Sequence, residues 1–171
     1  MELPVYKNNR DKSSDWIVIY GTISGVEGYA LEELNKIIQK YLPYIVQMIK
    51  ETNLVEDILR RNVLLVGTPD NNKILRGLID KDFLDILVYS KESLYIEIMQ
   101  NPYNHDNQLI LLSGSDANGL LYAVRDFGHY IVDLFDRVSY PGGKPEDIRP
   151  FNYPFPLCKM IQSPTVMQRG L

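Results

Sequence analysis

The chain has 171 residues, of which 45% are apolar and 23% are charged, and its formal net charge is −4 at pH 7. This length suits one ordinary domain with its own hydrophobic core, and the composition is typical of a globular protein. The acidic balance and the lack of clustered Lys and Arg argue against nucleic acid as a partner. No apolar run reaches the length of a transmembrane helix, so a membrane is not an expected partner either.

The first third of the chain predicts a strand followed by a helical connection. Residues 15–21 are rich in β-branched and aromatic side chains and stop at a glycine, which predicts a strand. From residue 29 to residue 49, apolar side chains recur at helical spacing. Pro43 interrupts that pattern, and it predicts a break near Leu42 because proline lacks an N–H group. Asn53, three residues before Glu56, predicts the start of a further short helix.

The middle of the chain predicts one strand and one short helix. Residues 62–66 form an apolar run that predicts the second strand, and the Gly-Thr-Pro-Asp sequence after it predicts a turn. Asp70 is the expected N-cap of a short helix over residues 74–78. Residues 80–91 are ambiguous between helix and strand, because short apolar runs fit both patterns.

Two further strands precede the stretch that organises the domain. Residues 93–100 alternate between apolar and polar side chains, residues 101–107 are rich in turn formers, and residues 108–112 are an apolar run. Two adjacent strands with so short a connection predict an antiparallel hairpin. The sheet is therefore expected to be mixed.

A long helix is predicted over residues 116–138, where Leu120, Val124, Phe127, Ile131, Leu134 and Val138 fall on one stripe. Ser115 or Asp116 stands where an N-cap is needed. Gly119 lies in the first turn, where the lack of a side chain lets the helix start approach a neighbouring backbone.

These elements predict an α+β fold with a mixed, mostly antiparallel sheet of about four strands and helices packed on one face. The composition changes after residue 138, because six of the ten prolines lie in the last 33 residues. The expected organisation is an α+β domain over residues 1–138 and an extended, proline-rich linker over residues 139–171.

Three segments in order carry a resemblance to known enzymes. The residues that match in the strand, turn and helix unit are Asp116, Gly119, Leu120, Leu121, Tyr122 and Ala123. This unit resembles the last strand and helix of the N-terminal domain of family 20 β-N-acetylhexosaminidases and family 67 α-glucuronidases. Residues 63–70 are similar to the second strand and turn of that domain, and residues 168–171 to the Arg-Gly start of the catalytic barrel.

The resemblance implies a non-catalytic N-terminal accessory domain of a larger carbohydrate-active enzyme. Its implied partner is its own C-terminal catalytic domain. Its implied location is periplasmic or secreted if a signal peptide was trimmed from the natural chain. Asp116, Gly119 and Tyr122 would be structural motif residues. Arg169 matches the family's substrate-binding arginine, which would contact sugar hydroxyls only where a barrel follows.

The chain itself is not expected to be an enzyme, although its parent would be a glycoside hydrolase. The family resemblance implies a catalytic Asp-Glu pair in the barrel, and these 171 residues contain no Asp-Glu dipeptide. A barrel also needs about 250 residues. No catalytic residue is therefore assigned.

The sequence also contains weak signs of nucleotide binding, metal binding and a cysteine nucleophile, and in each case a structural role for the residues is favoured. The spacing of Gly114 and Gly119 suits a phosphate-binding loop, but Leu120 and Leu121 stand where Lys and Ser or Thr are required. Asp126, His129 and Asp133 share a helix face but more often form an exposed polar face than a metal site. Cys158, the only cysteine, could pair with His105 or His129 only if the fold joined them. No cofactor or metal is expected.

A self-standing carbohydrate-binding or protein-interaction module is the alternative function. The aromatic residues of the last segment could stack on the rings of a glycan, although such a set more often packs a linker onto its own domain. This set comprises Tyr140, Phe151, Tyr153 and Phe155.

Overall fold

The computed structural model describes residues 16–41, 45–54, 56–137 and 155–163. These residues form an α+β fold with one mixed six-stranded sheet in the order β2-β1-β3-β5-β4-β6. The strands are β1 (Trp16–Tyr20), β2 (Ile45–Lys50), β3 (Asn62–Gly67), β4 (Leu94–Gln100), β5 (Gln108–Gly114) and β6 (Cys158–Gln162). The α-helices are α1 (Val26–Tyr41), α2 (Lys73–Leu78), α3 (Lys81–Tyr89) and α4 (Ala117–Arg137), and two 3-10 turns are η3 (Glu51–Asn53) and η4 (Glu56–Arg60).

The strand directions confirm a mixed sheet but correct its expected balance. β1 runs parallel to β2 and β3, and β3 runs parallel to β5. β4 is antiparallel to both β5 and β6, which confirms the predicted hairpin. Three of these five pairings are thus parallel, where a mostly antiparallel sheet was predicted. The reason is that helical segments separate β1 from β2 and β2 from β3, and such connections return the chain in the same direction.

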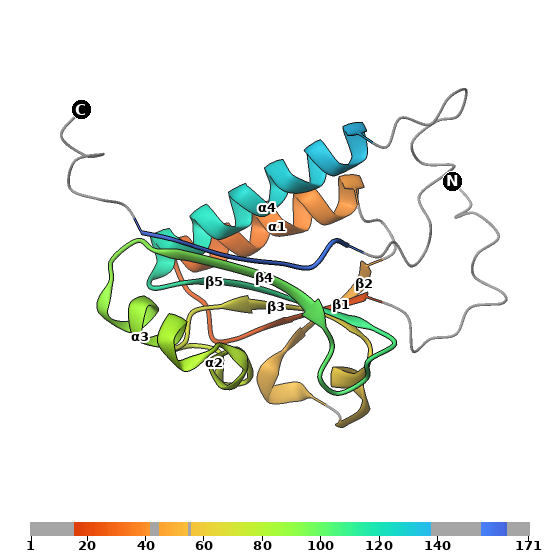
Figure 1. The fold of residues 1–171 in the computed structure, drawn as a ribbon, viewed down its shortest axis with the longest axis horizontal. Coiled ribbons are helices and arrows are strands. Elements are labelled where there is room, and N and C mark those ends of the chain that lie inside the picture. Colours follow the sequence, from red (N-terminus) through yellow and green to blue (C-terminus); the bar gives the residue numbers. More distant parts are fainter. Residues whose placement is uncertain (1–15, 42–44, 55, 138–154, 164–171) are drawn as a thin grey trace, which may run out of the picture.

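Helices cover both faces of the sheet, whereas one face was predicted (Figure 1). The face under α1 and α4 buries residues of even number from the central strands, including Val18, Leu64 and Ile110. The face over α2 and α3 buries residues of odd number, including Ile19 and Leu65. Because successive side chains of a strand point to opposite faces, a strand that is apolar at every position needs cover on both sides.

The two long helices lie side by side on their face of the sheet (Figure 1). Leu34 of α1 and Phe127 of α4 are fully buried, and each contributes roughly 1.5–3 kcal/mol through burial of its side chain. Gly128 lets the helices approach, since a Cβ atom there would lie 2.7 Å from Ile37 Cδ1. The predicted long helix is therefore confirmed as α4, and Leu120, Val124, Phe127 and Ile131 of its apolar stripe are buried in the core.

The helix α1 ends close to Leu42, where Pro43 predicted a break, but the prediction of helix for residues 45–49 was wrong. α1 ends at Tyr41, and residues 45–50 form the parallel edge strand β2. Met48 packs on the α1 and α4 side and Ile49 on the α2 and α3 side. The β-branched residues of this segment favour a strand, and pairing with β1 decides the outcome over the accidental helical spacing.

The ambiguous residues 80–91 contain helix α3. The short helix expected to begin at Asn53 is instead the 3-10 turn η4, and Asn53 is the last residue of η3. The N-cap of α2 is Asn72 rather than Asp70, because Asn72 Oδ1 accepts a hydrogen bond from Leu75 N–H at 3.0 Å. Asp70 lies two residues too early to reach the free N–H groups of that first turn.

The last described segment runs along the edge of the sheet as β6, where Glu97 faces Lys159 in the register with β4. An edge position suits a proline-flanked segment, since proline cannot donate to a central ladder. The division of the chain at residue 138 remains a prediction. Among the described residues, no helix combines the length and apolarity required to span a membrane.

Candidate functional site

The turn between β5 and α4 holds the residues that carry the family resemblance. Asp116 Oδ1 accepts a hydrogen bond from Gly119 N–H at 2.9 Å, so Asp116 caps the helix as one of the two expected residues. Its other oxygen, Oδ2, accepts from Glu92 N–H at 2.9 Å. The backbone carbonyl of Asp116 accepts from Leu120 N–H at 3.0 Å. This carboxylate therefore joins the start of α4 to the segment that enters β4.

Ser115 strengthens the same junction. Its Oγ accepts from Ser93 N–H at 2.9 Å, and its own N–H donates to the Ser93 carbonyl at 2.9 Å. Ser93 Oγ in turn lies 2.7 Å from Ser163 Oγ at the end of β6. The turn thus fixes three segments that are distant in sequence.

Two glycines make this close approach feasible. A Cβ atom on Gly119 would lie 2.2 Å from the Ser93 carbonyl oxygen, and one on Gly114 would lie 1.9 Å from Leu120 N. The structure thus confirms that Gly119 allows a neighbouring backbone to approach. The N–H groups of Gly119 and Leu120 are already bonded to Asp116. Because phosphate-binding loops offer such N–H groups to the ligand, this turn is built for packing rather than for a nucleotide.

The carboxyl ends of β1 and β3 are closed by a second turn, which contains Asn71 and Asn72. Asn71 accepts from Thr22 N–H through its carbonyl at 3.1 Å and from Thr68 N–H through Oδ1 at 2.8 Å. Asn72 is fully buried, and its Nδ2 donates to the Val66 carbonyl at 3.3 Å. Open α/β sheets bind ligands outside the carboxyl ends of their parallel strands. Here the chain's own turns occupy that position.

Sequence analysis missed Asn71 and Asn72. The one local sign of their role is that Asn72 stands three residues before Leu75, the spacing of an N-cap to its N3 position. The hydrogen bond from Thr22 N–H to the Asn71 carbonyl joins segments whose proximity depends on the pairing of β1 with β3.

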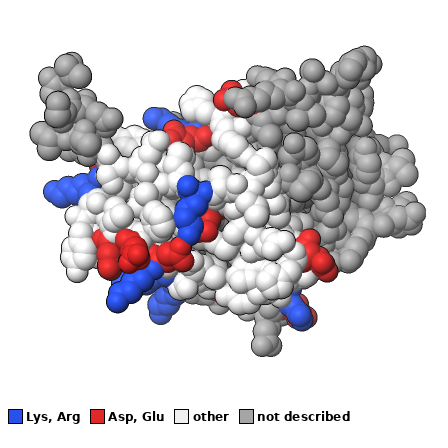
Figure 2. Space-filling model, viewed as in Figure 1, with Lys and Arg blue, Asp and Glu red and all other residues white. Residues whose placement is uncertain are grey.

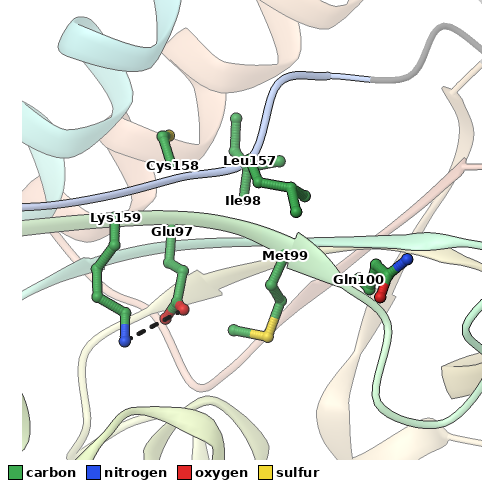
Figure 3. A pocket seen from close by; sticks show the side chains of 7 residues that line it. All are labelled: Glu97, Ile98, Met99, Gln100, Leu157, Cys158 and Lys159. Carbon is green, nitrogen blue, oxygen red and sulfur yellow. Dashed lines mark ion pairs between the residues drawn. The ribbon is translucent and has the colours of Figure 1, made fainter.

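A hollow of about 350 Å³ lies where β6 begins beside β4 (Figure 3). β6 starts at Cys158 opposite Ile98, whereas β4 continues to Gln100. The hollow therefore arises because the strand at the edge is shorter than its neighbour. It is lined by Glu97, Ile98, Met99, Gln100, Leu157, Cys158 and Lys159.

Charged and aromatic side chains gather beside this hollow. Lys159 Nζ forms an ion pair with Asp80, lies 3.5 Å from Glu97 Oε1 and stands 5.1 Å from the centre of the Phe83 ring. Glu97 also accepts a hydrogen bond from the Tyr95 hydroxyl. Figure 3 shows Lys159 and Glu97 pointing to the same side of the sheet. The cluster links β6 to β4 and to the start of α3.

The pKa shifts in this cluster indicate a structural role for its side chains rather than a catalytic one. The hydrogen bond to Asp80 is the main cause that raises the pKa of the Lys159 ammonium, so the lysine stays cationic at neutral pH. Burial, followed by the hydrogen bond to Glu97, raises the pKa of the Tyr95 phenol. Burial also raises the pKa of the Cys158 thiol, which disfavours the reactive thiolate. None of the three groups is tuned toward a base or nucleophile at pH 7.

The remaining candidate residues are distributed over the fold. Tyr122, His129 and Asp133 are exposed on α4, where Asp126 is partly buried. His105 is exposed in the turn between β4 and β5. Within the described ranges, no group of three or more His, Cys, Asp or Glu side chains could hold a metal ion. Figure 2 shows acidic and basic side chains next to one another on the face in view.

The aromatic residues of the last segment are described only in part. Phe155 is buried, and its ring meets Trp16 edge-on with centroids 5.6 Å apart. Phe155 therefore packs onto its own domain. This is the role that the sequence favoured over stacking on sugar rings. Arg169, Tyr140, Phe151 and Tyr153 lie outside the described residues.

Comparisons with known proteins give distant likenesses among solved structures and none among protein families or curated sequences. No protein-family profile matches this chain, and no curated protein sequence matches it. Among solved structures, the chain is similar to a GH138 enzyme targeting pectin rhamnogalacturonan II, with 15% sequence identity and a TM-score of 0.40. The match covers 75% of this chain and 11% of the length of that enzyme.

Proposed function

We propose that this chain is a non-catalytic accessory domain of a larger carbohydrate-active enzyme of the hexosaminidase or α-glucuronidase type. Its role is to support the catalytic barrel through an intramolecular interface. The observation that best supports this role is the engagement of both Asp116 carboxylate oxygens by backbone N–H groups of the same domain. The motif that carries the family resemblance is used to build the scaffold.

A carboxyl group that acts as an acid, base or nucleophile must reach the substrate. The two oxygens of Asp116 instead face Glu92 and Gly119. Glu97, the acidic residue of the hollow, is likewise engaged by Tyr95 and Lys159. Asp116 and Glu97 thus hold strands and helices of this domain together, and a supporting domain requires such internal contacts.

A protein-interaction module is the second candidate function. Ile86, Val88 and Tyr89 of α3 are exposed to 41%, 47% and 86%. Neighbouring exposed apolar side chains of this size favour burial against a partner. An accessory domain needs such an interface as well.

Enzyme assays on the purified 171-residue chain test the proposal first. The probes are a chromogenic N-acetyl-β-D-hexosaminide and a glucuronic-acid-bearing oligosaccharide. We expect no release of product above buffer, because the carboxyl groups of Asp116 and Glu97 are engaged by groups of the same domain. Hydrolysis by the purified chain at a rate that scales with its concentration would overturn the proposal.

The natural reading frame supplies the second test. If it continues through several hundred residues with a barrel pattern, the long protein should lose thermal stability when residues 16–137 are deleted. A reading frame without such a barrel contradicts the accessory role. A glycan array separates the carbohydrate-binding alternative, since a supporting domain predicts no binding to any glycan.

A further inference from the structure

Two buried polar atoms without partners lie at the carboxyl ends of β3 and β5, Ser113 Oγ in β5 and Asn71 Nδ2 in the turn after β3. The Ser113 side chain is completely buried, and its Oγ has no hydrogen-bond partner among the described residues. Asn71 Nδ2 is also buried and has no partner within the same residues. Burial of such groups without partners is unfavourable, so native proteins satisfy almost all of them.

The sheet register places both atoms over the same face. Ser113 is opposite Gly67 in the β3–β5 pairing. Two and four residues earlier, the paired residues Leu65 and Leu111, and Val63 and Leu109, belong to the core over α2 and α3. Because strand side chains repeat every two residues, the Ser113 side chain points to that same core.

Asn71 lies directly over Gly67. A Cβ atom on Gly67 would be only 2.5 Å from Asn71 Oδ1 and 3.6 Å from its Cγ. The side-chain amide of Asn71 thus occupies the space above Gly67. The backbone of Gly67 is one strand spacing, about 4.8 Å, from that of Ser113. The register therefore puts the two groups over adjacent strands on one face of the sheet, and they do not bond to each other.

The orientation of the amide is determined by its other contact. Thr68 N–H donates to Asn71 Oδ1 at 2.8 Å, so the oxygen faces the turn and Nδ2 is left as a donor. The Ser113 hydroxyl can donate one hydrogen bond and accept others. A single molecule that both accepts and donates would satisfy the two groups together.

We propose that one internal water molecule bridges Asn71 Nδ2 and Ser113 Oγ. Water accepts a hydrogen bond from the amide and exchanges one with the hydroxyl, and buried waters commonly make about three such bonds. This site would join the turn that closes β1 and β3 to the end of β5. The bridge thereby extends the polar closure at the carboxyl ends of β1 and β3 to the adjacent parallel strand β5.

Nuclear magnetic resonance of the full 171-residue chain tests the site with water itself as the probe. We expect a cross-relaxation peak between the Asn71 side-chain amide protons and the water frequency, with the sign of a long-lived bound water. A high-resolution crystal structure should place that water within hydrogen-bonding distance of both groups. A direct Asn71–Ser113 hydrogen bond, or an amide with no long-lived water contact, would overturn the proposal.

Ser113→Ala provides the matched variant. Removal of Oγ leaves the water with one partner fewer, so we expect loss of the Asn71 cross-peak and a Tm lower by about 2–4 °C. The exposed residue change Ser24→Ala is the control and should leave both measurements unaltered. A cross-peak that persists at full intensity in folded Ser113→Ala contradicts the bridge, and the wild-type spectrum decides the question if that variant fails to fold.

Discussion

Gln108 holds Phe155 through both ends of its side-chain amide. Its Nε2 donates to the Phe155 carbonyl oxygen at 2.7 Å, and its Oε1 accepts from Phe155 N–H at 2.8 Å. This pair joins the first residue of β5 to the segment just before β6, while the Phe155 ring rests against Trp16. The path of the chain into β6 is therefore fixed at the amino end of the central strands.

Gln108→Ala should release this segment from the sheet. Two hydrogen bonds are lost and the backbone groups of Phe155 lose their partner, so we expect the free energy of unfolding to fall by about 1–3 kcal/mol. Denaturant titration measures that change, and hydrogen exchange should show weaker protection of the Phe155 amide. Gln162→Ala, at an exposed position of β6, is the control. Equal effects of the two changes would show that the amide pair contributes nothing.

Two glycine substitutions should act with opposite signs. Gly119→Ala forces a methyl group against the Ser93 carbonyl oxygen, which lies 2.2 Å from the Cβ position. We expect it to destabilise the domain by about 1–3 kcal/mol through overpacking. Gly77→Ala, in the exposed part of α2, meets no atom within 4 Å. It should stabilise the domain by roughly 0.5–1 kcal/mol, because alanine favours a helix over glycine.

Thermal unfolding of both glycine variants provides the measurement. The pair is informative because each change adds the same methyl group to a helix of the same protein. A loss of stability at Gly77 comparable with that at Gly119 would mean that the close approach of α4 to Ser93 is not the cause.

The parts of the fold that depend on nearby residues were predictable from the sequence. The apolar run of β5, its turn and the stripe of α4 lie within about thirty consecutive residues, and local pattern rules apply to each of them. Asp116 and Gly119 could be assigned for the same reason, since a cap and a close approach are properties of one turn. The short connection between β4 and β5 likewise determined their antiparallel pairing.

The missed features depend on contacts between distant segments. The helical spacing up to Ile49 could not reveal that β1 would pair with β2, and this pairing makes the segment a strand. The ion pair of Lys159 with Asp80 spans 79 residues. The closure of the sheet by Asn71 requires β1 and β3 to be neighbours. Such contacts follow from topology, which residue patterns alone did not specify.

Asp116 should show a graded response to substitution. Asp116→Ala removes the acceptors for Gly119 and Glu92, and loss of a helix cap typically costs about 1–2 kcal/mol. Asp116→Asn keeps one oxygen, but its amide NH₂ cannot accept the second N–H group, so an intermediate stability is expected. Denaturant titration of the two variants gives the order. Asp85→Ala, at an exposed position of α3, serves as the control, and equal stability of Asp116→Asn and Asp116→Ala would contradict the two-acceptor role.

The domain should lose stability in alkaline solution because of Tyr95. Burial, and then the hydrogen bond to Glu97, raise the pKa of this phenol above its ordinary value of 10.0. The folded state therefore keeps a proton that the unfolded chain releases from about pH 10 upward. The resulting stabilisation is fully present below pH 10 and is lost as the pH rises toward the folded pKa.

Tyr95→Phe removes the titrating hydroxyl but keeps the ring, which packs 5.6 Å from the centre of Phe83. The free energy of unfolding of the wild type should fall more steeply between pH 9 and 11 than that of Tyr95→Phe, as measured by urea titration at each pH. Tyr103→Phe is the matched control, because it removes a hydroxyl from an exposed tyrosine and should retain the wild-type slope. Lys159 adds to the slope of both proteins in the same direction, since its raised pKa also disfavours proton release from the folded state. A slope that is unchanged in Tyr95→Phe would therefore assign the alkaline loss to Lys159 and other groups rather than to the Tyr95–Glu97 pair.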